Sequence, residues 1–84
     1  MERSALVESL IGKIYAKQSK WEEAMASLDR AQNIDHRFEM SYVYRGNIYE
    51  VTGDKPSAAT QYQQALALNP LNGVARDALA RVIR

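Results

Sequence analysis

Apolar residues recur at intervals of three to four positions along most of this chain, in runs separated by short polar stretches. The first two runs occupy residues 5–15 and 21–34, with a break of polar side chains between them. The next two occupy residues 42–49 and 58–68. Such spacing gathers the apolar side chains on one face of a helix. The pattern therefore predicts four consecutive amphipathic helices and an all-α fold.

Residues that begin or end helices lie between these runs. Ser19, with Glu22 three positions later, has the form of a capping box and predicts the start of the second helix. Gly53 suits a left-handed conformation at the end of the third helix, and Asp54 suits the N-cap of the fourth. Pro56 then falls in the first helical turn, where a missing amide hydrogen has little effect. The breaks agree with four separate helices.

An internal repeat relates the first two predicted helices to the next two. A shift of 34 residues aligns residues 5–38 with residues 39–72 without a gap. The identical pairs are Gly12 and Gly46, Ile14 and Ile48, Tyr15 and Tyr49, Ala24 and Ala58, and Ala31 and Ala65. Each unit is therefore predicted to form one helix–turn–helix hairpin.

A fifth segment matches only the opening third of this unit, and it does so in character rather than identity. Val74 aligns with Leu6, and Val82 aligns with Ile14. Asn72 suits the N-cap of a helix in this segment. We expect a terminal helix that covers the apolar edge of the second unit. The predicted organisation is one domain, residues 1–84, with repeats at 5–38 and 39–72 and a capping helix or partial third repeat at 73–84.

The recurring residues follow a known signature of small, aromatic and proline positions. The first unit contributes Gly12, Tyr15, Ala24, Leu28 and Ala31, and the second contributes Gly46, Tyr49, Ala58, Tyr62, Ala65 and Pro70. This set resembles the tetratricopeptide repeat family, whose unit is a helix–turn–helix of 34 residues. The resemblance implies a solenoid of two repeats plus a C-terminal capping helix, five helices in all. His36 departs from the family, which favours proline there, and so does Leu28, where it favours an aromatic residue.

The small signature residues have a steric role. Gly12 and Ala24 in the first unit, like Gly46 and Ala58 in the second, would let two antiparallel helices approach closely where they cross. Larger Tyr and Leu side chains then fill the space on either side. Ala31 would serve in the same way where one hairpin stacks on the next.

Composition narrows the class of function. Hydrophobic residues make up 46% of the 84 residues and charged residues 25%, as in a globular domain. A net charge of +1 with dispersed basic residues gives no footprint for nucleic acid. There is no cysteine, no signal-peptide core and no apolar run of the roughly 18–20 residues that span a bilayer. We expect a soluble, cytoplasmic protein without membrane insertion, although a signal peptide removed before Met1 would change the compartment.

No residues have the spacing of a catalytic or metal site. His36 lies at a predicted turn without a paired carboxylate or nucleophile, so a packing or turn role is expected. Asp35 and His36 alone are too few for a metal ion. The Gly53-Asp54 turn lacks the glycine spacing and preceding strand of a phosphate loop. The sequence therefore predicts no enzyme, no cofactor and no metal.

The resemblance also implies a binding site. In the family the first helix of each repeat lines a concave groove that receives a peptide. By position, the main groove residues here would be Leu6, Leu10, Lys13, Lys17, Met40, Val43, Tyr44, Asn47, Val51 and Arg81, with Ser9, Glu50, Val74, Asp77 and Ala78 beside them. So many apolar residues on one helix face need a partner. The expected function is a protein-interaction adaptor or scaffold whose partner is another protein or a peptide segment.

Other uses of this surface stay open. Some family members grip the C-terminal carboxylate of a chaperone with Lys, Asn and Arg, but Ser9 and Lys13 replace the first Lys and Asn, and only an Asn resembling Asn47 is clear. That clamp is disfavoured, while Lys13, Lys17 and Arg81 could still meet an acidic partner. Alternatively, the apolar stripe packs on a second copy of the chain or on further repeats of a longer array, or the module is an accessory domain of an enzyme. The sequence does not identify the partner, the pathway or the oligomeric state.

Overall fold

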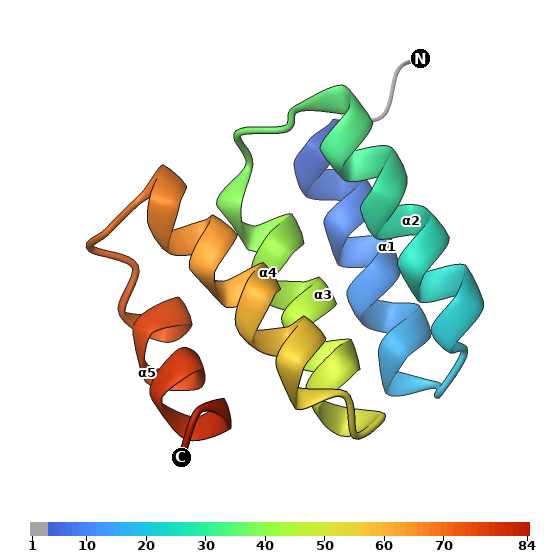
Figure 1. Cartoon of the computed structure of the whole chain (residues 1–84). Helices are drawn as coiled ribbons and strands as arrows, with labels where there is room; N and C mark the ends of the chain where they lie inside the picture. The colour runs from blue at the N-terminus through green and yellow to red at the C-terminus, as the bar shows by residue number, and fades with distance from the viewer. Residues whose placement is uncertain (1–3) are drawn as a thin grey trace.

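The computed structural model describes residues 4–84, and over that range the chain is all-α, as predicted (Figure 1). The described helices are α1 (Ala5–Lys17), α2 (Trp21–Ile34), α3 (Glu39–Val51), α4 (Lys55–Leu68) and α5 (Gly73–Val82). None of them is both long and apolar enough to cross a bilayer.

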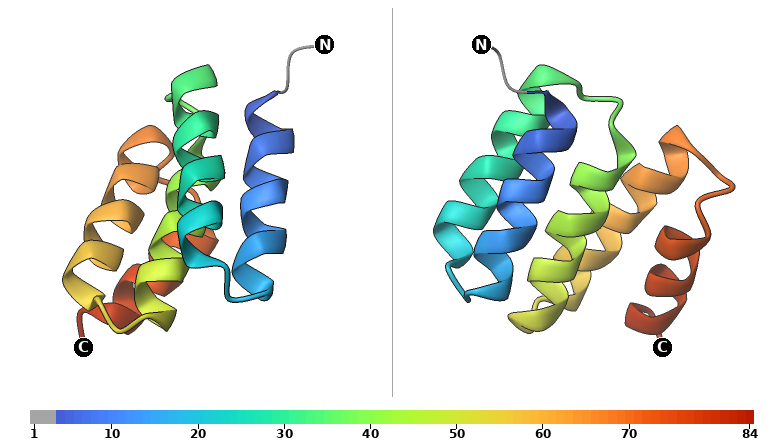
Figure 2. Two further views of the ribbon diagram at one scale, coloured as in Figure 1. Left: turned by 90° about the vertical axis from the view of Figure 1, so that its right-hand side faces the viewer. Right: turned by 180° about the vertical axis from the view of Figure 1, so that it is seen from behind.

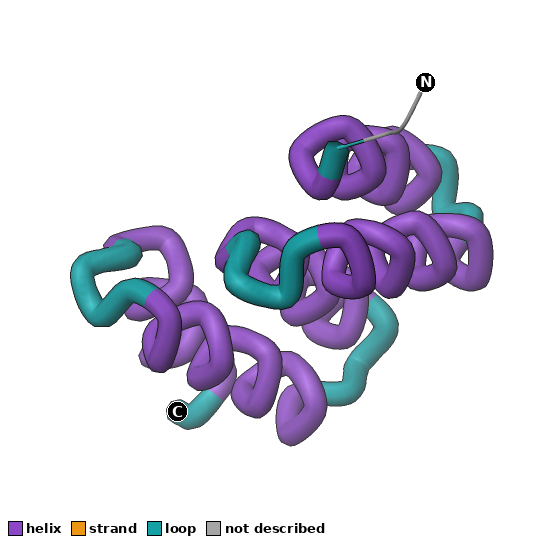
Figure 3. The backbone as a smooth tube through the Cα atoms, turned by 90° about the horizontal axis from the view of Figure 1, so that it is seen from above, coloured by secondary structure: helices purple, strands orange, loops and turns teal. Residues whose placement is uncertain are grey.

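The helices form two antiparallel hairpins followed by a single helix. The α1–α2 hairpin stacks on the α3–α4 hairpin, and α5 packs against α4 at the far end (Figures 1 and 2). Seen from above, the helix that follows the N-terminus lies on one side of the molecule and the C-terminus lies on the other (Figure 3). The resulting body is a flat slab of 42 × 26 × 15 Å. This is the helical-repeat architecture expected from the 34-residue period.

Short side chains begin and end the helices largely as the sequence predicts. Gly53 has a φ of +92°, and the Asp54 carboxylate caps α4 by accepting a hydrogen bond from the Ser57 amide at 3.1 Å. Asn72 caps α5 in the same way, because its side chain accepts from the Ala75 amide at 3.0 Å. Each cap satisfies an amide that the helix itself cannot.

The predicted capping box at Ser19 is wrong. α2 begins at Trp21, its N-cap is Lys20, and no side chain caps it. Ser19 instead adopts a left-handed conformation, with a φ of 59°, and the Lys20 amide donates to the carbonyl of Tyr15 at 2.9 Å. Ser19 thus occupies the position that Gly53 holds in the second unit. It ends α1 in the way Gly53 ends α3, which leaves it unable to cap α2.

Glycine lies where the helices of each hairpin cross. A Cβ atom added to Gly46 would come within 2.5 Å of Cε1 of Tyr62, whose ring is fully buried. A Cβ atom on Gly12 would meet Cγ of Leu28 at 2.8 Å and the carbonyl of Ala24 at 3.1 Å. The predicted steric role of the two glycines is therefore correct: in each hairpin a large side chain from the second helix fills the space beside the glycine.

Most of the buried apolar residues form two clusters. The larger joins α3, α4 and α5 and contains Val43, Ala58, Tyr62, Ala65, Ala75, Ala78 and Val82. The smaller joins α2 and α3 through Ala24, Leu28 and Ile48. The expected packing of α5 over the edge of the second unit is observed, since three of its residues belong to the larger cluster.

Substitution of Gly46 by Ala should destabilise the protein by about 1–3 kcal/mol, because the new methyl group overlaps a fixed aromatic ring. Replacing glycine by alanine inside a helix usually raises stability, so a loss at Gly46 would be the opposite of the usual effect. Gly73→Ala is the matched control: an added Cβ there finds only an Arg76 nitrogen, at 3.6 Å, so stability should hold or rise by up to about 1 kcal/mol. Urea unfolding followed by circular dichroism measures both. A Gly46→Ala protein as stable as the parent would contradict the close crossing.

Candidate functional site

The first helix of each unit lies on the same side of the molecule. From behind, α1, α3 and α5 follow one another across the view, with α2 and α4 on the opposite side of the slab (Figure 2, right). Two interactions join neighbouring first helices: Lys13 on α1 lies over the ring of Tyr44 on α3, and Glu50 on α3 binds Arg81 on α5. Asn47, one turn from Tyr44 on α3, is exposed as well. We call the surface defined by Lys13, Tyr44, Asn47, Glu50 and Arg81 the first-helix face.

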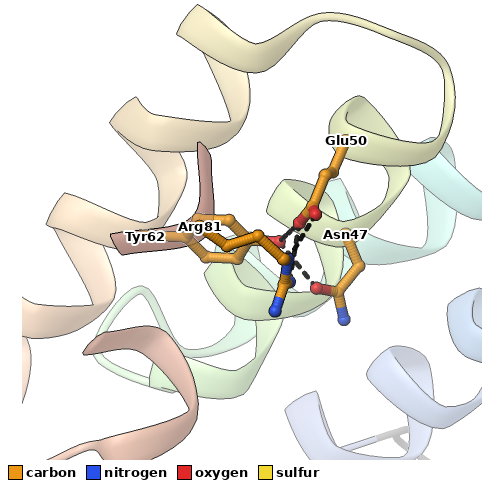
Figure 4. A network of polar contacts seen from close by, with 4 residues as sticks. All are labelled: Asn47, Glu50, Tyr62 and Arg81. Atoms are coloured by element: carbon orange, nitrogen blue, oxygen red, sulfur yellow. Dashed lines mark hydrogen bonds and ion pairs between the residues drawn. The ribbon is translucent and has the colours of Figure 1, made fainter. Parts of the chain in front are cut away.

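A polar network holds three helices together beneath this face (Figure 4). Arg81 donates to both carboxylate oxygens of Glu50, from Nε at 2.6 Å and from a terminal nitrogen at 2.8 Å. The Tyr62 hydroxyl lies 2.8 Å from Glu50 Oε1 and 2.7 Å from the Asn47 side-chain oxygen. A phenol carries one proton, so it donates to one of these acceptors at a time, and the charged carboxylate is the stronger.

The charges in this network stabilise one another. The hydrogen bond from Arg81 is the largest influence on Glu50 and holds the pKa of its carboxyl below the ordinary value. Burial is the main cause that raises the pKa of Tyr62, and its bond to Glu50 adds to the effect. The hydrogen bond with Glu50 likewise raises the pKa of Arg81. Glu50 is therefore an anion, Arg81 a cation and Tyr62 a neutral phenol throughout the physiological range.

A basic and aromatic region lies on the α1 side of the same face. The Lys13 ammonium lies 5.6 Å from the centroid of the Tyr44 ring, within the range of a cation–π interaction. Lys17, one turn further along α1, is exposed and forms no ion pair with any residue in the range 4–84. Two cations beside a half-buried aromatic ring can attract an anionic group and provide an apolar surface next to it.

Most of the apolar residues predicted to line the groove are accessible. The exposed fractions are 53% for Leu6, 43% for Leu10, 71% for Val51 and 59% for Val74. Met40 is half-buried and packs against the larger core cluster. Their contact with a partner stays a prediction.

Val43 is a correction to the predicted lining. Its side chain is 1% exposed and belongs to the core with Tyr62, so it has no surface to offer a partner. Ser9, the equivalent residue of the first unit, is also fully buried. Both face the second helix of their own hairpin. Ala78, 3% exposed, is buried against α4, because α5 packs there along its length.

Two polar residues of the predicted site are already engaged within the chain. The Asn47 side-chain oxygen lies against the Tyr62 hydroxyl, which leaves its amide nitrogen for a partner. Arg81 is bound by Glu50 through two hydrogen bonds, so it is not a free cation for an acidic ligand. Its role as drawn in Figure 4 is to attach α5 to α3. Sequence spacing alone gave no sign of this, because the partners lie 31 residues apart.

A cavity that the sequence did not predict lies between α2 and α3. Its volume is about 440 Å³, and its walls include Trp21, Met25, Ile48 and Tyr49, with Glu22 and Asp29 among the polar lining residues. Trp21 is half-buried, as expected for a residue that packs near the turn. The sequence offered one indication of this cavity: the one tryptophan of the chain, Trp21, is followed one helical turn later by Met25. In the part of the chain that the structure describes, no cluster of three His, Asp or Glu residues could hold a metal ion.

The Glu50→Gln substitution should lower stability by about 1 kcal/mol at pH 7, a modest value because Arg81 is half-exposed. The folded-state pKa of Glu50 is lowered, so the carboxylate stabilises the fold above its ordinary pKa of 4.5. That stability is lost as the pH falls through the lower folded-state pKa. The difference between parent and variant in free energy of unfolding should therefore narrow as the pH falls below 4.5.

Urea unfolding at pH 7 and at pH 3 tests this expectation. Asp77→Asn is the control, because its pair with Arg76 is long, at 3.7 Å, and both side chains are largely exposed. That variant should match the parent within about 0.5 kcal/mol at both pH values. Equal stability of Glu50→Gln and the parent at pH 7 would show that the network does not hold α5 in place.

Comparisons with known proteins agree with this architecture. The family model described as tetratricopeptide repeat matches residues 40–72. A search of curated protein sequences finds no match. Among solved structures, the Arabidopsis OM64 TPR domain is 24% identical, with a TM-score of 0.88 over 95% of this chain and 66% of that one.

Two further similar structures contain bound peptides. The second TPR domain of human RPAP3, in complex with the HSP70 peptide SGPTIEEVD, is 25% identical, with a TM-score of 0.86 over 96% of this chain and 68% of that one. The first TPR of Spaghetti (RPAP3), bound to the HSP90 peptide SRMEEVD, is 19% identical, with a TM-score of 0.55 over 94% of this chain and 90% of that one. The chain thus spans about two thirds of the first two domains.

Proposed function

We propose, from the premise that this chain is a member of the tetratricopeptide repeat family, that it is a protein-interaction module which binds a partner peptide on its first-helix face. Two similar domains are solved with peptides bound, which supports a peptide as the class of ligand. The fold itself is an interaction scaffold and is typically non-enzymatic.

The observation that carries the proposal is the uncovered pairing of Lys13 with Tyr44. The ring and the ammonium lie side by side on adjacent helices. On the same helix as Lys13, Leu6 is 53% exposed. An aromatic ring supplies a large contact area at a small cost in side-chain entropy, and a lysine supplies charge. These are features of a binding surface rather than of a solvated helix face, which should be mainly polar.

The charges favour an acidic partner with apolar side chains. Lys13 and Lys17 are exposed and form no ion pair with residues 4–84. Glu50, the acidic residue of the face, is neutralised by Arg81. An extended segment could thus place carboxylates on the α1 side and apolar side chains against Tyr44 and Val51. A clamp for a chaperone tail is not supported, because the position of its first Lys is filled by the buried Ser9.

Peptide display with the whole chain as bait should enrich sequences that combine acidic and apolar residues. The double variant Lys13→Glu and Lys17→Glu should then weaken an enriched peptide by about tenfold or more, because it replaces attraction with repulsion. The same peptide should bind the parent less tightly at high salt. Fluorescence polarisation with the labelled peptide gives both dissociation constants.

Arg37→Glu is the control for a general charge effect. Arg37 is an exposed cation in the turn between α2 and α3, outside the first-helix face, so its reversal should change affinity little. Circular dichroism checks that all variants stay helical. Enriched peptides without acidic residues, or binding that survives the double variant unchanged, would refute the proposed site.

A further inference from the structure

The outer surface of α1 repeats a surface that is covered elsewhere in the molecule. Val7, Leu10 and Ile14 follow one another along α1 at helical spacing, and their exposed fractions are 43%, 43% and 56%. We call these three residues the α1 stripe. They lie on the side of α1 away from the buried Ala5, Ser9 and Gly12. Three large apolar side chains in one row are thus left uncovered by the rest of the described chain.

The equivalent rows of the other two units are packed under a preceding helix. On α3 the equivalents of Val7, Leu10 and Ile14 are Ser41, which is fully buried, Tyr44, which is half-buried, and Ile48, which is 4% exposed. Ile48 packs with Ala24 and Leu28 of α2, and Tyr44 packs against the same cluster. Beside this row, Arg45 binds Asp29 of α2 at 2.8 Å.

On α5 the equivalent row is buried against α4. Ala75 and Val82 belong to the larger core cluster, and Leu79 packs against that cluster. In two of the three units, therefore, another helix packs on this surface of the first helix. The α1 stripe has the same position and greater apolar character, which indicates that it too receives a helix.

The opposite end of the slab has a different chemistry. The outer surface of α5 carries Arg76, Asp77, Ala80 and Arg84, all exposed, with the exposed Val74 and Ile83 at its margins. The charged side chains suit a helix surface that faces water. Stacking of one copy on the next, head to tail, would place these charges against the apolar α1 stripe and desolvate them without partners.

We propose that the α1 stripe docks on the α1 stripe of a second copy of this chain and forms a two-fold dimer. The two ends of the slab are not complementary to each other, but the stripe is complementary to itself, and such a self-complementary contact closes at two copies. Leu10 lies near the middle of α1, so a two-fold axis there brings Leu10 of both copies together. Val7 of each copy then meets Ile14 of the other across an antiparallel helix pair.

The basic residues of α1 are compatible with this arrangement. Lys17 lies in the last turn of α1, so an antiparallel pair places the two Lys17 side chains at opposite ends of the interface. Lys13 is directed towards Tyr44 on the first-helix face. One helix pair buries a small area, typical of weak and transient interfaces below about 1,200 Å². The dimer should therefore depend on concentration, and it does not rest on the proposed peptide binding.

Sedimentation equilibrium of the whole chain, up to about 1 mM, tests the proposal. The expected result is a reversible monomer–dimer equilibrium that Leu10→Glu shifts to monomer, and Ile14→Lys likewise. Both residues are exposed in the monomer, so the circular dichroism spectrum should stay that of the parent. Val51→Glu is the matched control, since Val51 is an exposed apolar residue of α3 outside the stripe, and it should associate as the parent does.

A cysteine at the proposed two-fold axis gives an independent readout, because the chain contains none of its own. Leu10→Cys should form a disulfide-linked dimer under oxidation about tenfold faster than Val51→Cys, since docking raises the effective thiol concentration. A monomer at every concentration would overturn the proposal and assign the stripe to a helix of another polypeptide. Association that Leu10→Glu leaves intact, or equal crosslinking of the two cysteine variants, would overturn it as well.

Discussion

The Tyr62 ring fills the space where a side chain at position 46 would otherwise lie, and its hydroxyl reaches through to the Glu50 carboxylate. The missing Cβ of Gly46 lets α3 and α4 approach, and the buried ring keeps them in register. Glu50 then holds Arg81, so the contact that joins one hairpin also attaches α5. The placement of α3, α4 and α5 relative to one another depends on this one steric and polar unit.

The first hairpin lacks the polar half of that unit. Leu28 takes the place of Tyr62 beside Gly12, so the crossing is equally close but ends in a methyl group rather than a hydroxyl. Lys13 occupies the position of Asn47 and is therefore free to lie over Tyr44 on the neighbouring helix. Three differences between the units, Leu28 for Tyr62, Lys13 for Asn47 and Ala16 for Glu50, thus separate a neutralised region at α3–α5 from a cationic region at α1. A peptide that binds this face would meet a preformed surface at one end and mobile charges at the other.

The helices and their crossings could be predicted because they follow from short-range spacing and from steric size. Gly46 and Tyr62, for instance, recur in phase with Gly12 and Leu28, and helical periodicity alone places them at a crossing. The error at Ser19 has another cause. Ser19 and Glu22 have the spacing of a capping box, but Ser19 adopts the left-handed turn conformation that Gly53 has in the second unit and therefore does not cap α2. Val43 was predicted to lie in the groove but is buried, because alignment with the repeat does not distinguish it from its half-buried neighbour on the same helix, Tyr44. The Glu50–Arg81 pair depends on contacts between distant units, which spacing within a unit does not encode.

The two ends of the slab differ in polarity, and this difference bears on the two proposed interactions, peptide binding and pairing of two copies. An outer helix of a repeat stack either presents polar side chains to water or buries its apolar surface on something else. α5 mostly follows the first course: Arg76, Asp77 and Arg84 are exposed, and Ala75, Ala78 and Val82 are buried against α4, although Val74 and Ile83 stay exposed. α1 follows the second, because its outer row retains the apolar character of a repeat that is covered. The first-helix face runs across α1, α3 and α5, whereas the α1 stripe lies on the outer side of α1, and Leu10 lies where the two surfaces meet. Peptide binding through Lys13 and Tyr44 and pairing of two copies through the α1 stripe therefore use neighbouring surfaces, and two modules joined through α1 would present two peptide-binding faces to one partner chain.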